Sequence, residues 1–165
     1  DNLLYEYRYL KNTKFINGDI SDYKKINKVF KKKYDAIIWL AALVGDGACA
    51  ANPEITKKLN YDSVHNLLEN YKGKIIFMST CSVYGQSNLL LNEKSKKNPQ
   101  SLYAKTKIDA EKLINKKNKN SCIFRLGTLY GLGDQSSRIR LDLVVNILTM
   151  KAALGRPLEV FLWCW

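Results

Sequence analysis

The chain has 165 residues, 46% of them hydrophobic, which is enough to bury one core and too few for two comfortable domains. Lysine and arginine outnumber aspartate and glutamate by 27 to 15, for a net charge of +12, but the lysines lie in short runs beside Asn and Ser that are typical of a solvated surface. No charged-then-apolar leader opens the sequence, and no apolar run approaches the ~20 residues of a membrane span. We therefore expect a soluble protein with no membrane and no nucleic-acid partner.

The cysteines give no sign of a metal site or a disulfide framework. Cys49, Cys81, Cys122 and Cys164 are isolated along the chain and have no paired metal-ligand spacing. This pattern favours reduced thiols in a cytoplasmic protein, with no bound metal.

Short apolar runs alternate with longer helical patterns from Lys14 onward, which predicts a parallel sheet with helices on both faces. The predicted strands span residues 14–17, 35–41, 74–79 and 121–126. Their central parts are nearly all apolar, as in strands that are buried on both faces. We therefore predict an α/β fold of the Rossmann type, a doubly wound parallel sheet.

Helices are predicted between these strands from the spacing of apolar side chains. In the first helix, Tyr23, Ile26 and Phe30 share one face, and Ser21 or Asp22 can cap its start. The remaining predicted helices run from Asn52-Pro53 through Leu68, over residues 101–115 and over residues 140–154. Residues 85–100 are rich in Asn, Ser and Lys and predict a long polar loop of the kind that carries function.

Both ends differ from those of a complete nucleotide-binding domain. No Gly-x-Gly-x-x-Gly or Gly-x-x-Gly-x-x-Gly spacing occurs near the start, so the first strand and its phosphate-binding turn are expected to be missing. At the other end, residues 161–165 stop on aromatic side chains without a capping element. We interpret residues 1–165 as a partial NAD-binding Rossmann domain, truncated at both ends, with most of the carboxyl-terminal substrate region absent. Such a chain is expected to be inactive by itself.

Two segments carry the strongest functional signal. Residues 79–85, Ser-Thr-Cys-Ser-Val-Tyr-Gly, follow a predicted buried strand, and residues 103–107, Tyr-Ala-Lys-Thr-Lys, open a predicted helix. A Tyr four residues before a Lys is a weak signal alone, because Tyr7 and Lys11 form such a pair too. In this order, however, the two segments resemble the extended short-chain dehydrogenase/reductase family, in its NAD-dependent epimerase/dehydratase branch.

The resemblance implies a catalytic set of Thr80, Tyr103 and Lys107. Tyr103 would act as base and acid, Lys107 would lower the phenol pKa from its usual value near ~10, and Thr80 would hydrogen-bond the same substrate oxygen. The spacing suits these roles, since residues four apart on a helix share a face. The alternative is that Tyr103 is a helix-surface aromatic and Thr80 a strand-end hydroxyl.

The resemblance also implies NAD as the cofactor. Asp1 resembles the acidic residue that binds the adenosine ribose hydroxyls, which favours NAD over NADP; alternatively it is only a polar first residue. The full set of implied cofactor contacts is Asp1, Asp19, Ile20, Leu40, Ala41, Ala42, Asn60, Tyr103, Lys107 and Leu126.

Residues 43–49 and 124–131, with 137–146, are similar to a nucleotide-sugar subgroup of the family. The implied substrate contacts are Thr80, Ser82, Tyr103, Thr128 and Arg138, with Arg140 as an alternative to Arg138. Guanidinium groups suit phosphate oxygens, although a lone Arg is more often a solvated or structural cation.

One departure from the family pattern bears on the reaction. Family dehydratases carry an Asp-Glu pair directly after the strand-end Thr, where this chain has Cys81-Ser82. We therefore expect epimerisation of a nucleotide-diphosphate sugar through a transient ketone rather than 4,6-dehydration. A reductase or dehydrogenase with the same residues, and a non-catalytic remnant, remain alternatives. Family members commonly pair through the Tyr–Lys helix and its neighbour, which predicts a possible homodimer.

Overall fold

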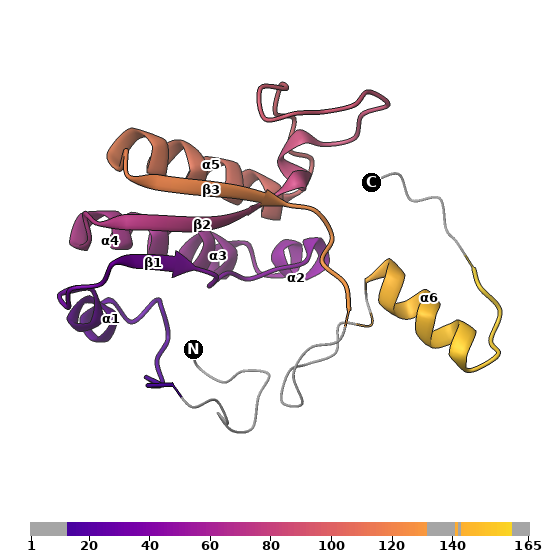
Figure 1. Ribbon diagram of the computed structural model, residues 1–165, viewed down its shortest axis with the longest axis horizontal. Helices are drawn as coiled ribbons and strands as arrows, with labels where there is room; N and C mark the ends of the chain where they lie inside the picture. Colours follow the sequence, from indigo (N-terminus) through magenta and orange to yellow (C-terminus); the bar gives the residue numbers. More distant parts are fainter. Residues whose placement is uncertain (1–12, 132–140, 142, 160–165) are drawn as a thin grey trace. The chain divides into compact units, whose positions relative to one another are not determined.

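The computed structural model describes residues 13–131, 141 and 143–159, and the chain divides into two compact units. The larger unit, residues 18–127, contains the sheet and the helices α1 to α5 (Figure 1). The smaller unit takes in the described residues 13–17 and those from 128 onward, which include helix α6 (Val144–Ala153). No described helix is long and apolar enough to cross a membrane.

The sheet of the larger unit has three parallel strands in the order β1-β2-β3 among the described residues. These are β1 (Ala36–Trp39), β2 (Lys74–Thr80) and β3 (Ser121–Leu126). Trp39 is in register with Phe77, and Thr80 with Leu126, so the three carboxyl ends meet at one edge. Ligands bind at this edge in open α/β sheets.

The helices of the larger unit follow the strands in crossover order. They are α1 (Tyr23–Phe30), α2 (Asp46–Ala51), α3 (Pro53–Lys57), a π-helical turn η1 (Lys58–Asp62), α4 (Ser63–Asn70), a 3₁₀ turn η2 (Cys81–Tyr84) and α5 (Leu102–Lys117). Asp22 caps α1 by accepting a hydrogen bond from the Lys25 amide, and Pro53 occupies the first turn of α3, as the sequence predicts.

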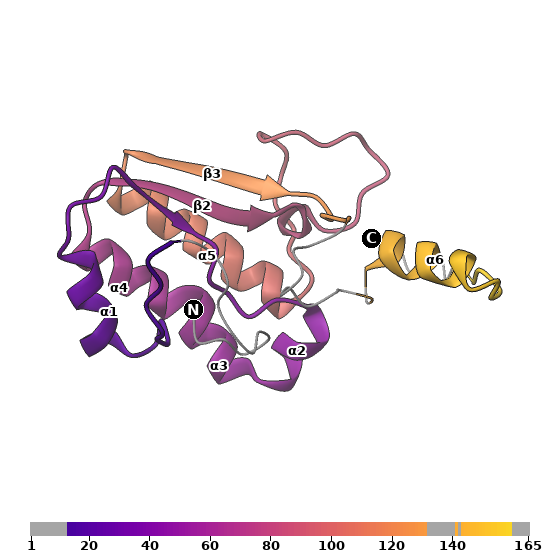
Figure 2. The ribbon, with the colours of Figure 1, turned by 60° about the horizontal axis from the view of Figure 1, so that its bottom comes forward.

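One face of the sheet carries the core. Trp39, Ile75 and Phe77 point to this face and pack against α4 and α5, with Phe30 of α1 beside Trp39. Figure 2 shows α1, α3, α4 and α5 together on this side. Because side chains alternate along a strand, the other face carries the intervening residues. There Ile38 and Phe124 are exposed, so within residues 18–127 helices cover one face only.

The structure corrects three details of the sequence prediction. Residues 14–17 form no strand, since a strand needs a hydrogen-bonding neighbour and the described strands pair only with one another. Helix α6 begins at Val144 rather than at residue 140, with residue 141 in a turn. The short helix α2, which precedes Asn52, was not predicted.

The segment after η2 is a loop, as predicted, and its far end returns to η2. The Asn98 amide donates to the carbonyl of Val83, which brings the far end of the loop back to η2. Gly85 sits between them with φ +70°, and a Cβ at this position would lie 2.2 Å from the Asn98 carbonyl oxygen. Only glycine fits this close approach.

Candidate active site

The strand-end threonine lies where the sequence predicts it. Thr80 is the last residue of β2, is buried, and is paired in register with Leu126, the last residue of β3. Its Oγ1 accepts a hydrogen bond from the Ser82 amide at 3.2 Å and lies 3.1 Å from the Ser82 hydroxyl. Thr80 therefore caps the 3₁₀ turn, and the two hydroxyls stand together at the carboxyl edge of the sheet.

Helix α5 brings the second half of the predicted catalytic set to the same region. Ser101 caps the helix by accepting from the Ala104 amide at 3.1 Å, which fixes the start of the turn that carries Tyr103. The helix packs against β2 and against η2. Tyr103 and Lys107 lie one turn apart on this helix, and the Tyr103 side chain is half-buried while Lys107 is only 4% exposed.

Lys107 is held in an unusual environment for a lysine. Its Nζ lies 4.4 Å from the centre of the Phe77 ring, a cation–π contact made from the covered face of β2. Burial lowers the pKa of Lys107 from 10.5 to about 8, and the nearby negative charge of Glu111 partly opposes that shift. At neutral pH the amine is therefore still mostly a cation, with little water around it.

The turn after β1 supplies a second part of the site. Leu40 is 70% exposed and Ala41 and Ala42 are half-buried, so small side chains leave the backbone of this turn accessible. Asn60, in the π-helical turn η1, fixes the next residue: its Oδ1 accepts from the Leu43 amide at 2.8 Å and its Nδ2 donates to the Leu43 carbonyl at 2.9 Å.

Asn60 also reaches α5. Its Nδ2 lies 3.4 Å from the Thr106 hydroxyl, which in turn donates to the carbonyl of Tyr103 at 2.8 Å. Asn60 is 1% exposed, so the amide joins the turn after β1 to the helix that carries Tyr103 from inside the protein. π-Helical turns within helices are frequent at functional sites.

Two of the predicted cofactor contacts, Asp19 and Ile20, lie in a tight turn before α1. Asp19 is exposed, and its carboxylate accepts from the Ser21 amide at 2.7 Å, a hydrogen bond that lowers the pKa of Asp19. Its carbonyl accepts from the Asp22 amide at 3.1 Å. Ile20 is half-buried and packs against the core, so this turn presents its polar atoms to solvent.

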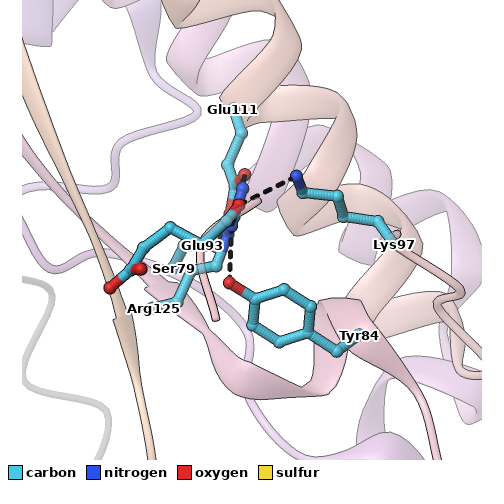
Figure 3. Close-up of polar contacts among 6 residues, drawn as sticks. All are labelled: Ser79, Tyr84, Glu93, Lys97, Glu111 and Arg125. Atoms are coloured by element: carbon cyan, nitrogen blue, oxygen red, sulfur yellow. Dashed lines mark hydrogen bonds and ion pairs between the residues drawn. The ribbon is translucent and has the colours of Figure 1, made fainter. Parts of the chain in front are cut away.

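A charged network beneath the strand ends was not predicted from the sequence. Glu111, on the buried face of α5, accepts from Arg125 Nη2 at 2.6 Å, from Arg125 Nε at 3.0 Å and from the Ser79 hydroxyl at 2.5 Å (Figure 3). The hydrogen bonds that Arg125 donates to Glu111 and Tyr84 raise the pKa of Arg125 above its usual range. A carboxylate among apolar neighbours on a helix face was the available signal, because such a group requires a buried partner.

The structure does not place the remaining predicted residues relative to this site. Asp1, Arg138 and Arg140 lie outside the described residues, and Thr128 is exposed in the smaller unit. Within the described residues, no group of three or more His, Cys, Asp or Glu side chains could hold a metal ion.

The site has three features that bear on its chemistry. It offers paired hydroxyls at a strand end, a phenol one helical turn from a buried cation, and an accessible small-residue turn at the carboxyl edge of a parallel sheet.

The family model described as the NAD dependent epimerase/dehydratase family matches residues 2–163. The chain belongs to this family.

Relatives in the epimerase/dehydratase family include both reaction types. A dTDP-D-glucose 4,6-dehydratase of Dictyostelium discoideum is 34% identical over 142 residues, which are 73% of this chain and 32% of that protein. UDP-glucose 4-epimerase 3 of Oryza sativa subsp. japonica is 36% identical over 77 residues, 44% of this chain and 21% of that protein. The chain thus spans less than a third of the length of these relatives.

Solved structures show the same Rossmann-type fold. The UDP-glucuronic acid 4-epimerase of Bacillus cereus, in complex with UDP-glucuronic acid and NAD, is 29% identical with a TM-score of 0.71. The match covers 89% of this chain and 48% of that one.

Proposed function

We propose that this protein binds NAD and epimerises a nucleotide-diphosphate sugar, with Tyr103 as base and acid, Lys107 as the cation that activates it, and Thr80 as a second hydrogen-bonding group on the same sugar oxygen. The observation that carries the proposal is Lys107: an amine that is buried against Phe77 one turn from Tyr103, on a helix that packs against the end of β2.

The proposal gives each side chain a task in the reaction. A cation beside a phenol favours the phenolate, and in this proposal Lys107 would supply that cation to Tyr103. Tyr103 would take the proton of a sugar hydroxyl and later return it. Thr80 would hold that oxygen as its charge changes, from the fixed end of a strand. NAD, when bound, would accept the hydride from the sugar carbon and give it back to the opposite face.

The described residues fit a dinucleotide at the carboxyl edge. The accessible turn at residues 40–42 leaves room for the backbone to approach a ligand, and Leu126 ends β3 beside Thr80. Asp19 and Ile20 would contact the adenine end, and Asn60 would keep the turn after β1 in place for the cofactor.

Epimerisation is favoured over dehydration by the residues of η2. Elimination of water needs an acid and a base at the sugar in addition to the Tyr103 phenol, and family dehydratases carry Asp-Glu after the strand-end Thr. In this chain these positions are Cys81 and Ser82, and η2 contains no carboxylate. Ser82, hydrogen-bonded to Thr80, is suited instead to a sugar hydroxyl or a phosphate oxygen.

The test is turnover in the presence of NAD. The chain, extended to the full length of its relatives, would be incubated with NAD and separately with UDP-glucose, UDP-glucuronic acid and dTDP-glucose, and the products analysed by mass spectrometry and NMR. Residues 1–165 alone, which we expect to be inactive, would be the control. We expect an epimer of unchanged mass and no net NADH. A product lighter by one water would identify a dehydratase, and stoichiometric NADH a dehydrogenase. Absence of NAD binding by calorimetry, together with absence of any product, would reject the proposal.

We also propose that the protein pairs with a second copy through α3, η1 and α5. A groove of about 780 Å³ runs along these elements, and its lining combines apolar residues, Pro53, Tyr61, Leu102 and Leu113, with charges of both signs. Self-complementary surfaces of this kind suit a two-fold dimer.

A further inference from the structure

The buried carboxylate of Glu111 lies one helical turn after Lys107 and two turns after Tyr103. It is 1% exposed. Desolvating a carboxylate costs several kcal/mol unless charged and polar partners surround it. Among the described residues, Arg125 and Lys107 are cations near this carboxylate, and which of them it pairs with decides what Lys107 can do.

The carboxylate pairs with Arg125 and not with Lys107. Arg125 Nε approaches both carboxylate oxygens, at 3.0 and 3.2 Å, and its Nη2 donates to Oε2 at 2.6 Å. Among the described residues no ion pair joins Glu111 to Lys107, whose Nζ lies over the Phe77 ring instead. A guanidinium makes such a fork with a carboxylate in a fixed plane, which an ammonium cannot do.

The strands explain why the arginine is placed there. Ser79 and Arg125 are register partners on β2 and β3, one residue before the pair Thr80 and Leu126. Their side chains therefore point together to the covered face, where both meet Glu111. The carboxylate is thus tied to two neighbouring strands immediately beneath the residue that holds the substrate oxygen.

The same guanidinium reaches the turn after β2. Arg125 Nη1 donates to the Tyr84 hydroxyl at 2.7 Å and to the Glu93 carbonyl at 3.2 Å, as Figure 3 shows in part. Tyr84 is the last residue of η2, which carries Ser82, and Glu93 lies in the loop that follows. One side chain therefore joins α5, both strand ends and η2.

We propose that Arg125 and Ser79 are positioning residues that hold the Glu111 carboxylate between the ends of β2 and β3. Because the carboxylate is held there, it does not pair with the Lys107 ammonium, which stays available to Tyr103. The inference rests on the proposed function, because it concerns the same Tyr–Lys pair. Neither positioning residue is required to touch the substrate.

The test follows Lys107 itself and needs no turnover. In ¹³C-labelled protein, the Lys107 side-chain resonance would be assigned with Lys107→Arg and followed against pH. In Arg125→Met, Lys107 is the cation that remains near the carboxylate within the described part of the chain, so the pKa of Lys107 should rise above about 8. In the double variant Glu111→Leu/Arg125→Met the carboxylate is gone, and the pKa should fall below about 8.

Shifts of opposite direction in the single and double variants are not expected from a merely structural role. The double variant also guards against misfolding, since replacing a buried ion pair by apolar residues of similar volume is commonly neutral for stability. Tyr84→Phe is the matched control: it removes one partner of Arg125, leaves the Glu111 pair intact, and should leave the pKa of Lys107 where it is.

Turnover separates this inference from the proposed function. If the protein epimerises a nucleotide sugar, Arg125→Met should lower kcat on the order of 10- to 100-fold with little change in KM, as expected when a catalytic group is displaced. Shifted Lys107 titrations without sugar turnover in the unmodified protein would reject the function and keep the positioning role. A pKa of Lys107 that is the same in the unmodified protein and the double variant would overturn the positioning role.

Discussion

Replacing Asn60 by alanine tests whether one buried amide holds the turn after β1 in place. The substitution removes the hydrogen bond that Asn60 accepts from the Leu43 amide, at 2.8 Å, and the one that it donates to the Leu43 carbonyl, at 2.9 Å. It also removes the longer contact to Thr106, and it opens a small cavity, because Asn60 is 1% exposed.

The expected cost follows from these contacts. A hydrogen bond contributes about 0.5–1.5 kcal/mol net, and a buried backbone group left without a partner costs about 1–3 kcal/mol. Water that enters the turn can satisfy part of the loss at Leu43, so we expect Asn60→Ala to lower the free energy of unfolding by about 2–4 kcal/mol. In urea this corresponds to a midpoint lower by roughly 1–2 M.

The assay is urea unfolding followed by far-UV circular dichroism, with NAD affinity measured on the same preparations. Asn70→Ala is the matched control, because Asn70 is an exposed residue at the end of α4 and its side chain bonds Asn66, its one side-chain partner among the described residues. The control should change stability by less than about 0.5 kcal/mol. If the two variants unfold at the same urea concentration, the amide does not hold the turn, and a role for Asn60 in shaping the cofactor site has no support.

Three further predictions concern helix α5. Burial lowers the pKa of Lys107 to about 8, so protonating it in the fold costs up to roughly 3 kcal/mol. This penalty is complete below about pH 8 and vanishes above the unfolded pKa of 10.5. Lys107→Met should therefore be more stable than the unmodified protein at pH 7 and no more stable near pH 10.5 by urea unfolding; an advantage that is equal at both pH values would contradict the assigned pKa. Tyr103→Phe should keep the circular dichroism spectrum and lower kcat by roughly 10²–10⁴-fold in the epimerisation assay, so near-normal turnover would remove Tyr103 from the mechanism. Leu102→Glu should convert a dimer to a monomer in sedimentation velocity, whereas an unmodified protein that is already monomeric at high concentration would exclude pairing through the α3–α5 face.

Local sequence patterns predicted the elements that are determined locally. The strands at 74–79 and 121–126 are runs of apolar and β-branched residues, and they match β2 and β3 within one residue. The predicted helix at 101–115 matches α5, because its capping Ser101 and its helix-forming residues specify it without help from the rest of the chain. β2 and α5 carry Thr80, Tyr103 and Lys107, so the position of the proposed catalytic residues in the fold could be predicted from the sequence.

The features that were predicted wrongly or were not predicted depend mainly on residues that are distant in the sequence. The run at 14–17 has strand composition, but pairing requires a neighbour that composition does not reveal. The double hydrogen bond from Asn60 to Leu43 spans 17 positions, and nothing in the sequence indicates that the amide faces that turn. The short helix α2 lacks any periodic apolar pattern in its six residues, Asp46–Ala51, and its only buried residue is Cys49.

Predicting the Glu111–Arg125 ion pair requires both a local feature of α5 and the register of two strands that are distant in the sequence. Glu111 continues the buried stripe of α5, in which Ala104, Ile108 and Ile114 are apolar, so its position alone demands a cation. The chain offers 27 lysines and arginines, and the sequence does not choose among them. The strand register that pairs Ser79 with Arg125 selects Arg125, because it places the guanidinium on the helix side of the sheet at the level of the carboxylate.

The environment of Lys107 follows from two opposed requirements. A lysine in bulk water is strongly hydrated and gives a nearby phenol little help, whereas a lysine buried among apolar groups alone would lose its proton near neutral pH. Contact with the Phe77 ring supplies the burial, and Glu111, one turn away but committed to Arg125, supplies enough negative charge to hold the pKa of Lys107 at about 8. A direct ion pair with Glu111 would keep the cation but direct it away from Tyr103. Because Arg125 on β3 holds the Glu111 carboxylate, that carboxylate can stabilise the protonated form of Lys107 without forming a direct ion pair with Lys107.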